Sequence, residues 1–199
     1  ERWEYRNKTE TRSILVHQNS VVLQVTDYER FEDFAEHLSL AVRTVLETTE
    51  HDKFGLIQRV GLRYVDTIVP KAERDYRFYL RPGLHGISKN DFQKGTHRIF
   101  IENTGRTDVE GRTGTMAVRV FQNDKGFDLP PDVIVGAPKR RINTKPGKLV
   151  TLVDMDHFIE GNFEPSVDWV VKTAYILHDQ IVETFHQDIV TKDAVKEWK

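Results

Sequence analysis

The sequence contains no cysteine, which excludes a disulfide framework, a thiolate metal site and a cysteine nucleophile. No apolar run approaches the roughly 18 residues of a membrane-spanning helix, so a helical span is excluded. The 29 basic and 31 acidic side chains nearly cancel, which removes attraction of the whole molecule to nucleic acid or anionic lipid as a driving force. Any such binding must be local. Because a cysteine-free chain fits a reducing compartment, we expect a cytoplasmic protein.

Several motifs of catalysis and cofactor binding are also missing. There is no G-x-S-x-G nucleophile elbow, no G-x-x-x-x-G-K-[ST] phosphate loop and no G-x-G-x-x-G dinucleotide fingerprint. None of the eight histidines stands in an H-x-x-x-H, H-E-x-x-H or H-x-H arrangement, so no zinc signature can be written. The sequence therefore predicts no cofactor, no metal site and no catalytic residue, and it favours a protein that is not an enzyme.

The segments that are present predict an α+β fold. Alternation of apolar and polar residues predicts strands at 13–17, 21–25, 54–69, 96–103, 113–122 and 148–157. A shorter strand is expected at 76–80. Apolar residues spaced by three or four predict one long helix after the capping box Thr26–Glu29 and a second that Pro165 opens. Because strands follow one another in runs, we expect a mainly antiparallel sheet with the two long helices packed on one face.

We expect a single domain over residues 1–199, since neither an internal repeat nor an inter-domain linker is visible. The chain opens at Glu1 without an initiator Met, so we expect a fragment trimmed at its N-terminus. The turn between strands 96–103 and 113–122 is expected to hold the glycines and charges of residues 105–111.

A long loop at 123–147 is rich in proline, glycine and basic residues. Its length exceeds what compact domains usually tolerate without a function or mobility. Its cations, with no acid between Asp132 and Asp154, are Lys139, Arg140, Arg141, Lys145 and Lys148. They could dock an acidic protein partner or nucleic acid, or the loop is a solvated connection only.

Arginines line the polar face of the 54–69 strand. Arg59 and Arg63 project opposite its apolar residues, and Arg119 is expected on a neighbouring strand. Guanidinium groups in this arrangement can hold a phosphate or carboxylate of a ligand in bidentate geometry. Sheets also use such arginines in cross-strand pairs, here with Glu102 or an acid elsewhere.

Other ionisable residues carry weaker signals. Asp154 and Asp156 share one face of a strand, which suits a hard cation, but such a site needs further ligands. His178 lies beside the apolar stripe of the last helix and is expected to be a core histidine. His85 lies in the loop Pro82–Gly86 and is the better functional candidate by its placement.

The segment Arg59-Val60-Gly61-Leu62-Arg63-Tyr64-Val65-Asp66-Thr67-Ile68 resembles the R-[IV]-G-L-R-Y-[IV]-[ND]-x-I strand of an uncharacterised bacterial and archaeal protein family of sporadic distribution. The likeness covers nearly the whole chain, and it departs at Asp66, where Asn is commoner. Members usually carry an extra N-terminal strand. Sporadic distribution implies genes that travel, as components of defence and toxin-antitoxin systems do.

Two hypotheses about function follow. The first is a non-enzymatic binding or interaction module that self-associates or binds a protein partner, as one component of such a prokaryotic system, with no membrane involved. The second is an enzyme or binding protein for a phosphorylated or anionic small molecule or for nucleic acid. In that case Arg59, Arg63 and Arg119 would hold the anion, and Asp66 or His85 would move protons. Convergence of these side chains in a pocket distinguishes the two.

Overall fold

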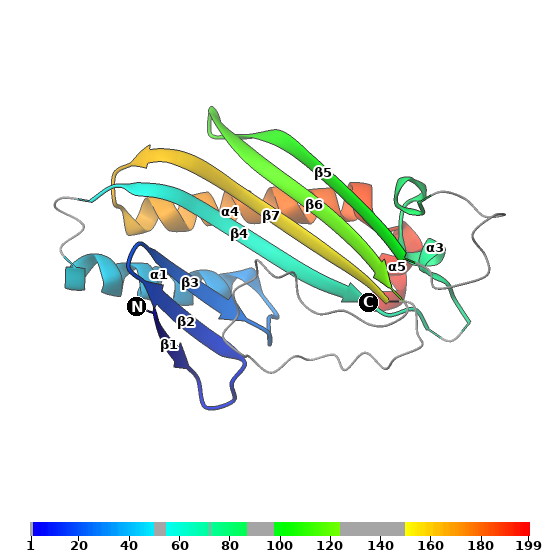
Figure 1. Cartoon of the computed structure of the whole chain (residues 1–199), viewed down its shortest axis with the longest axis horizontal. Coiled ribbons are helices and arrows are strands. Elements are labelled where there is room, and N and C mark those ends of the chain that lie inside the picture. The colour runs from blue at the N-terminus through cyan, green and yellow to red at the C-terminus, as the bar shows by residue number, and fades with distance from the viewer. Residues whose placement is uncertain (1, 50–54, 72, 87–97, 124–149) are drawn as a thin grey trace. The chain divides into compact units, whose positions relative to one another are not determined.

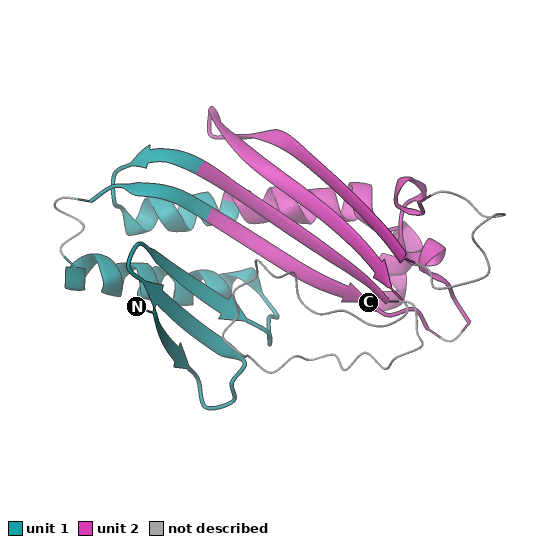
Figure 2. Ribbon diagram, viewed as in Figure 1, with its two compact units in different colours: residues 1–60, 129–143, 160–175 teal, residues 61–128, 144–159, 176–199 magenta. Residues whose placement is uncertain are grey.

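The computed structural model describes residues 2–49, 55–71, 73–86, 98–123 and 150–199 (Figure 1). Its strands form two antiparallel sheets, of three and four strands, and several helices accompany them, which confirms the predicted α+β class. The chain divides into two compact units (Figure 2). Unit 1 comprises residues 1–60, 129–143 and 160–175, and unit 2 comprises residues 61–128, 144–159 and 176–199.

Unit 1 holds the three-stranded sheet, whose order is β1-β2-β3. Its elements are β1 (Arg2–Arg6), β2 (Arg12–His17), β3 (Ser20–Val25) and α1 (Phe31–Thr49). The strands predicted at 13–17 and 21–25 are present as β2 and β3, which form a hairpin whose turn, residues 18 and 19, lies between the paired His17 and Ser20. Helix α1 packs against β3 and buries Phe31, Ala35 and Ala41. These positions follow the helical spacing expected of a core-facing stripe.

Unit 2 holds most of the four-stranded sheet, whose order is β4-β7-β6-β5. The strands are β4 (Ile57–Ile68), β5 (Arg98–Val109), β6 (Arg112–Asn123) and β7 (Val150–Phe163). The helical segments are α3 (Tyr76–Tyr79), the 3-10 turn Pro82–Leu84, α4 (Val167–Thr184), the π-helical turn Phe185–Ile189 and α5 (Lys192–Trp198). Strands β4 and β7 and helix α4 contribute residues to both units. Within the described part of the chain, the helices are too short or too polar to cross a membrane.

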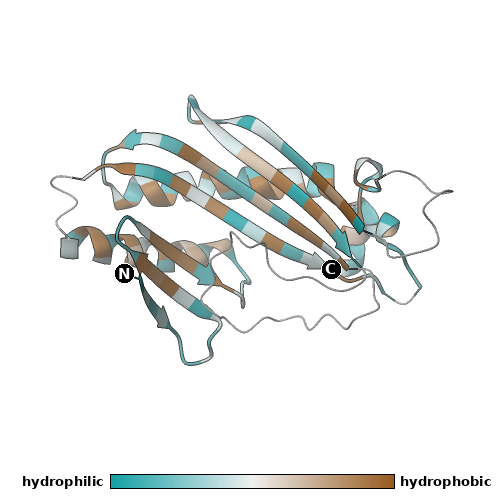
Figure 3. Cartoon of the chain, viewed as in Figure 1, coloured by the Kyte–Doolittle hydropathy of each residue, from teal (hydrophilic) through white to brown (hydrophobic). Residues whose placement is uncertain are grey.

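Strand β7 is the centre of the four-stranded sheet. Six successive residues, Val150–Met155, are buried, so both faces of this strand are shielded from solvent along that stretch. Figure 3 shows the alternation of hydrophobic and hydrophilic residues along the strands of this sheet. On one face of the sheet, the part of α4 in unit 2 contacts β7, since the carbonyl of Leu177 lies 3.2 Å from Nδ1 of His157.

The turn between β5 and β6 is shorter than the sequence predicts. Both strands continue to Val109 and Arg112, which pair directly across a turn of only Glu110 and Gly111. These two residues have φ values of 53° and 75°, the left-handed pair that a tight hairpin turn requires. The prediction of a turn over 105–111 was wrong because the end of this hairpin is exposed and polar, and its residues therefore resemble a loop.

Two further local predictions were wrong. Residues 76–80 begin with the short helix α3, whose first turn is capped because the side chain of Asp75 accepts a hydrogen bond of 2.8 Å from the backbone N–H of Arg77. Helix α1 does follow residues 26–29, but it begins at Phe31, so Thr26 lies five residues ahead of it and is not the predicted cap. The Thr26 hydroxyl instead donates to the carbonyl of Thr11, and so ties the chain back to β2.

His157 is a fully buried histidine between β5 and α4. Its Nδ1 donates to the Leu177 carbonyl, because a carbonyl can only accept, and its Nε2 lies 2.8 Å from the hydroxyl of Thr107. This geometry holds the neutral ring with its proton on Nδ1. Burial lowers the pKa of His157, although the bond to Leu177 and the charge of Asp156 act in the opposite direction.

We predict that the buried ring of His157 makes the fold sensitive to acid. The unfolded histidine titrates near pH 6.5 and the folded one below it, so the folded and unfolded states bind the same number of protons above about pH 6.5. Below that pH the unfolded state takes up a proton first, and the free energy of unfolding falls by at most about 1.4 kcal/mol per pH unit from this group. Urea denaturation at pH 7.5 and 5.5 should show that His157→Gln removes this part of the loss. The exposed His186→Gln should keep it, and equal pH dependence in wild type and His157→Gln would contradict the prediction.

Candidate functional site

A row of alternating charges crosses the four-stranded sheet on the face opposite α4. It takes one residue from each strand in spatial order, namely Arg63, Asp154, Arg119 and Glu102, and we call it the charge row. Arg63 donates to both carboxylate oxygens of Asp154, at 2.6 and 2.7 Å. Arg119 donates to Asp154 at 3.3 Å and to Glu102 at 3.2 Å. The predicted pairing of these arginines with acids across the sheet is therefore present.

The register of the sheet produces this row. Glu102 is paired with Arg119 between β5 and β6, and Arg119 is paired with Asp154 between β6 and β7. Directly opposed residues of opposite charge stabilise antiparallel strands. Burial lowers the pKa of Arg119, but its hydrogen bonds to Glu102 and Asp154 outweigh burial and raise it.

Asp154 is the centre of the charge row. Its side chain is 0% exposed, whereas Arg63 and Arg119 are 21% and 25% exposed. A buried carboxylate needs compensating positive charge, and here two guanidinium groups supply it. Both carboxylate oxygens of Asp154 accept hydrogen bonds from arginine. Asp154 is therefore not available as a ligand of the cation site considered for Asp154 and Asp156. Among the described residues, no group of three or more histidine or acidic side chains could hold a metal ion.

The other candidate arginine, Arg59, belongs to unit 1. Its Nη1 lies 3.7 Å from the carboxylate of Glu160 on β7, and both side chains are about half exposed or more. Such an exposed pair adds little stability. All three arginines that the sequence proposes for anion binding are thus paired with carboxylates of their own sheet.

The proton-transfer candidates lie elsewhere. Asp66 occupies the face of β4 opposite Arg63, because side chains alternate along a strand. Burial raises the pKa of Asp66 to about 6. Nδ1 of His178 lies 2.9 Å from the hydroxyl of Tyr64, a hydrogen bond that fits the expectation of a core histidine.

His85 has a structural role in unit 2. Its Nε2 donates to the carbonyl of Leu80 at 2.8 Å, and its ring meets Tyr76 edge to face at 5.8 Å. The hydroxyl of Tyr76 donates in turn to the carbonyl of His85. These contacts close the short loop around the 3-10 turn, so the ring is fixed by the fold.

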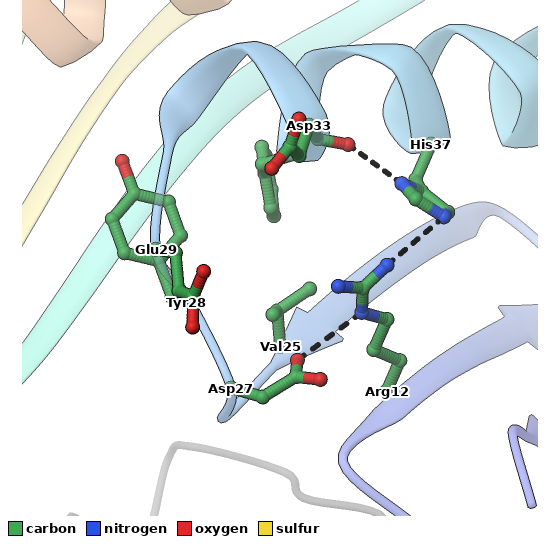
Figure 4. Close-up of a pocket in the computed structure, with 8 residues that line it drawn as sticks. Arg12, Val25, Asp27, Tyr28, Glu29, Asp33 and His37 are labelled. Carbon is green, nitrogen blue, oxygen red and sulfur yellow. Dashed lines mark hydrogen bonds and ion pairs between the residues drawn. The ribbon is translucent and has the colours of Figure 1, made fainter.

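A pocket of about 270 Å³ at the start of α1 was not predicted (Figure 4). Arg12 of β2 connects its walls, since Nε donates to Asp27 at 3.1 Å and Nη1 lies 3.2 Å from Nε2 of His37. Nδ1 of His37 donates to the carbonyl of Asp33 at 2.6 Å. Burial acts to raise the pKa of Asp27, but hydrogen bonds from Arg12 and Thr11 more than offset it, so the pKa is lowered.

The chemistry of this pocket favours binding over proton transfer. Both ring nitrogens of His37 are engaged, one by a carbonyl and one by a guanidinium, so neither is directed into the pocket. The carboxylates of Glu29 and Asp33 and the rings of Tyr28 and Phe34 complete the lining, and this combination suits a small cationic group. Acids at the start of a helix are common because they complement the helix dipole, so these residues by themselves do not predict a pocket.

A second, more open pocket of about 500 Å³ lies at the C-terminal end of unit 2 and is lined by basic residues, among them Arg81, Lys192 and Lys196. The guanidinium of Arg81 donates to the carbonyls of Val190 and His186, at 3.0 and 3.4 Å. Arg81 therefore satisfies carbonyl groups at the end of α4 and its π-helical turn, a common role of cations at helix C-termini.

The basic loop lies outside the described residues. This holds for all of its candidate side chains, Lys139, Arg140, Arg141, Lys145 and Lys148. Its role in binding an acidic partner or nucleic acid stays a prediction.

Comparisons with known proteins show no relative of this chain. No family model, curated protein or solved structure matches it. The resemblance carried by Arg59–Ile68 and the single-domain organisation over 1–199 stay predictions from the sequence.

We predict that the charge row stabilises the sheet mainly through Asp154. Asp154→Asn removes the carboxylate that compensates Arg63, and it leaves Arg119 with Glu102 alone. This substitution should lower the free energy of unfolding by about 3 kcal/mol. Glu102→Gln, at the exposed end of the same row, should cost no more than about 1 kcal/mol. Chemical denaturation of the two variants measures both effects. Equal losses of unfolding free energy in the two variants would contradict the prediction, because the buried Asp154 would then contribute no more than the exposed Glu102.

We also predict that Asp66 destabilises the fold at neutral pH. Its folded pKa of about 6 exceeds the unfolded value near 3.9, so stability is lost as the pH rises through this window and stays lower above it. Asp66→Asn should raise the free energy of unfolding at pH 7.5 by up to about 3 kcal/mol, the equivalent of the pKa shift. The advantage should shrink towards pH 4. Denaturation at both pH values tests this, and an advantage independent of pH would refute it.

Proposed function

We propose that this chain is a non-enzymatic interaction module that binds a protein partner or a second copy of itself. The family resemblance supports placing it in a mobile prokaryotic system of the defence or toxin-antitoxin type, where such modules act as one component. The single observation that carries the proposal is the pairing of Arg59, Arg63 and Arg119 with carboxylates of their own sheet.

That pairing weakens the alternative of an enzyme or receptor for an anionic small molecule. An anion bound at Arg63 or Arg119 would have to displace Asp154, whose buried carboxylate has no other compensating charge in the row. The proposed proton donors do not join the arginines either. Asp66 faces away from Arg63 across β4, and His85 is bonded to Leu80.

The exposed residues of strand β5 offer what an interaction module needs. Phe100 on β5 is 55% exposed and stacks on Phe121 of β6 at 4.8 Å. An exposed aromatic pair rimmed by arginine and acidic side chains is typical of the centre of a protein interface, where aromatic and arginine residues dominate the binding energy. Nucleic acid remains an alternative ligand through the basic loop.

The molecular mass of the purified protein in solution, which reports its state of association, tests the proposal. The chain is co-expressed with its neighbouring gene, purified, and measured by light scattering over a range of concentrations and salt. We expect a complex with the neighbouring product or a self-assembled species. A strictly monomeric protein that retains no partner would contradict the proposal, and retention of nucleic acid that is lost at high salt would favour the alternative.

We predict that Phe100→Ser weakens this association at least about tenfold, because an exposed aromatic at an interface contributes more than 1.4 kcal/mol. Leu40→Ser on α1 is the matched control, since Leu40 is similarly exposed at 63% and lies away from the four-stranded sheet in sequence. The dissociation constant from sedimentation measures both variants. An equal loss of affinity in the two variants would move the interface away from β5.

A further inference from the structure

Strand β5 ends the four-stranded sheet in the part of the chain that the structure describes. It is 12 residues long, and its even-numbered residues from Arg98 to Asp108 are all exposed. A long exposed edge strand is a template on which another strand can pair, and proteins that keep one often use it for association.

The hairpin geometry shows which backbone groups of β5 point outward. Val109 and Arg112 close the two-residue turn, so the odd-numbered residues of β5 form the hydrogen-bonded pairs with β6. The N–H and C=O groups of the even-numbered residues then point to the outer edge. One contact agrees with this parity, because the carbonyl of Asp108 accepts a hydrogen bond of 2.7 Å from Nε2 of Gln180 on α4.

We propose that β5 pairs antiparallel with β5 of a second copy of this chain, about a two-fold axis that passes through Asn103. This inference rests on the proposed function and names its partner. The two four-stranded sheets then form one continuous sheet, and each contact occurs twice, as two-fold symmetry requires. Residues 98 to 108 of one copy lie opposite residues 108 to 98 of the other.

The charges of β5 are complementary to themselves in this register. Arg98 faces Asp108 of the second copy, which gives an ion pair on each side of the axis. Phe100 faces Arg106, so that the guanidinium lies against an aromatic ring that Phe121 already supports from its other side. Glu102 keeps Arg119 of its own sheet and faces the uncharged Thr104. No like charges are opposed.

The neighbouring registers are worse. An axis at residue 102 places Arg98 opposite Arg106 and Glu102 opposite its own copy, and like charges opposed across strands are destabilising. An axis at residue 104 pairs Glu102 with Arg106, but it also places Phe100 against Asp108, which brings a carboxylate to an electron-rich ring. Opposed like charges thus disfavour the axis at 102, and the contact of Phe100 with Arg106 favours the axis at Asn103 over the one at 104.

Gly105 fits the same register. It stands in the middle of a strand, and a Cβ added there would meet no atom within 4 Å. Glycine inside a strand often marks the close approach of another backbone. With the axis at Asn103, Gly105 lies opposite Ile101 of the second copy and leaves room for its side chain.

Strand β1, an edge of the three-stranded sheet, is less suited to self-pairing than β5. Strand β1 carries Trp3 and Tyr5, which are 51% and 63% exposed, but it is only five residues long. The same two-fold operation about Glu4 would place Arg2 opposite Arg6 of the second copy. The greater length of the strand therefore favours β5 over β1.

The absence of native cysteine makes a direct test possible, because every introduced thiol is unique. Across the proposed axis the two Asn103 residues form a non-hydrogen-bonded pair with Cα atoms about 4.5 Å apart. This distance lies within the range that a disulfide spans. In Asn103→Cys, mild oxidation of the full chain should therefore shift the band on a non-reducing gel from the monomer to the dimer.

Two variants are matched controls. In Gly105→Cys the thiols lie four residues out of register, about 13 Å apart, and should not join. Glu4→Cys probes the β1 edge. Selective joining of Asn103→Cys supports the proposal. Joining in all three variants, or in Glu4→Cys alone, overturns it.

The solution mass separates this inference from the proposed function. If the wild-type chain is a dimer, or binds another protein, and Asn103→Cys does not join, the pairing through β5 is wrong while the interaction module stands. If the chain is monomeric at every concentration and binds no partner, both proposals fail.

Discussion

The buried carboxylate of Asp154 is the constraint on which the four-stranded sheet depends. It lies on the central strand β7, its side chain has no exposure to solvent, and its charge must be compensated inside the fold. Arg63 from β4 and Arg119 from β6 meet this need from the two neighbouring strands. The same contacts fix the register of β6 on β7 and draw β4 to the opposite side of β7, so one ionised group ties three strands together.

This constraint also limits what the protein can do with its arginines. Guanidinium groups on a sheet face are an attractive site for phosphate, yet a phosphate would here compete with a preorganised and desolvated carboxylate. The histidines are engaged in a similar way, since His37, His85 and His157 each bond to a backbone carbonyl. These polar groups are held in place by contacts within the fold. On strand β5, Phe100 and the charged side chains of alternate residues face solvent.

Much of the fold followed from residue spacing, because hydrophobic periods of two and of three to four residues mark β2, β3, β4, α1 and α4 clearly. The alternation of side chains along the strands also predicted that Arg63 and Arg119 lie on a polar face, where they can pair with acids. The role of Asp154 did not, because the pairing of β4 with β7 joins segments 91 residues apart, and sequence spacing does not encode that neighbourhood. The polar end of the β5–β6 hairpin was taken for a turn because exposed strand residues lack an apolar face. The pocket at α1 was missed because a helix start by itself explains acids such as Asp33, and only the contact of Arg12 with His37 reveals the enclosure.

The arginines of the charge row are part of the fold, and a double-mutant cycle between Arg63 and Asp154 tests this role most directly. Arg63→Gln, Asp154→Asn and the double variant are compared with wild type by urea denaturation, and the coupling free energy is taken from the four values. We predict a coupling free energy of about 2–3 kcal/mol between Arg63 and Asp154, the upper part of the range for residues in direct contact. A coupling near zero would contradict it, because Arg63 would then contribute nothing through Asp154 and would be available to a ligand.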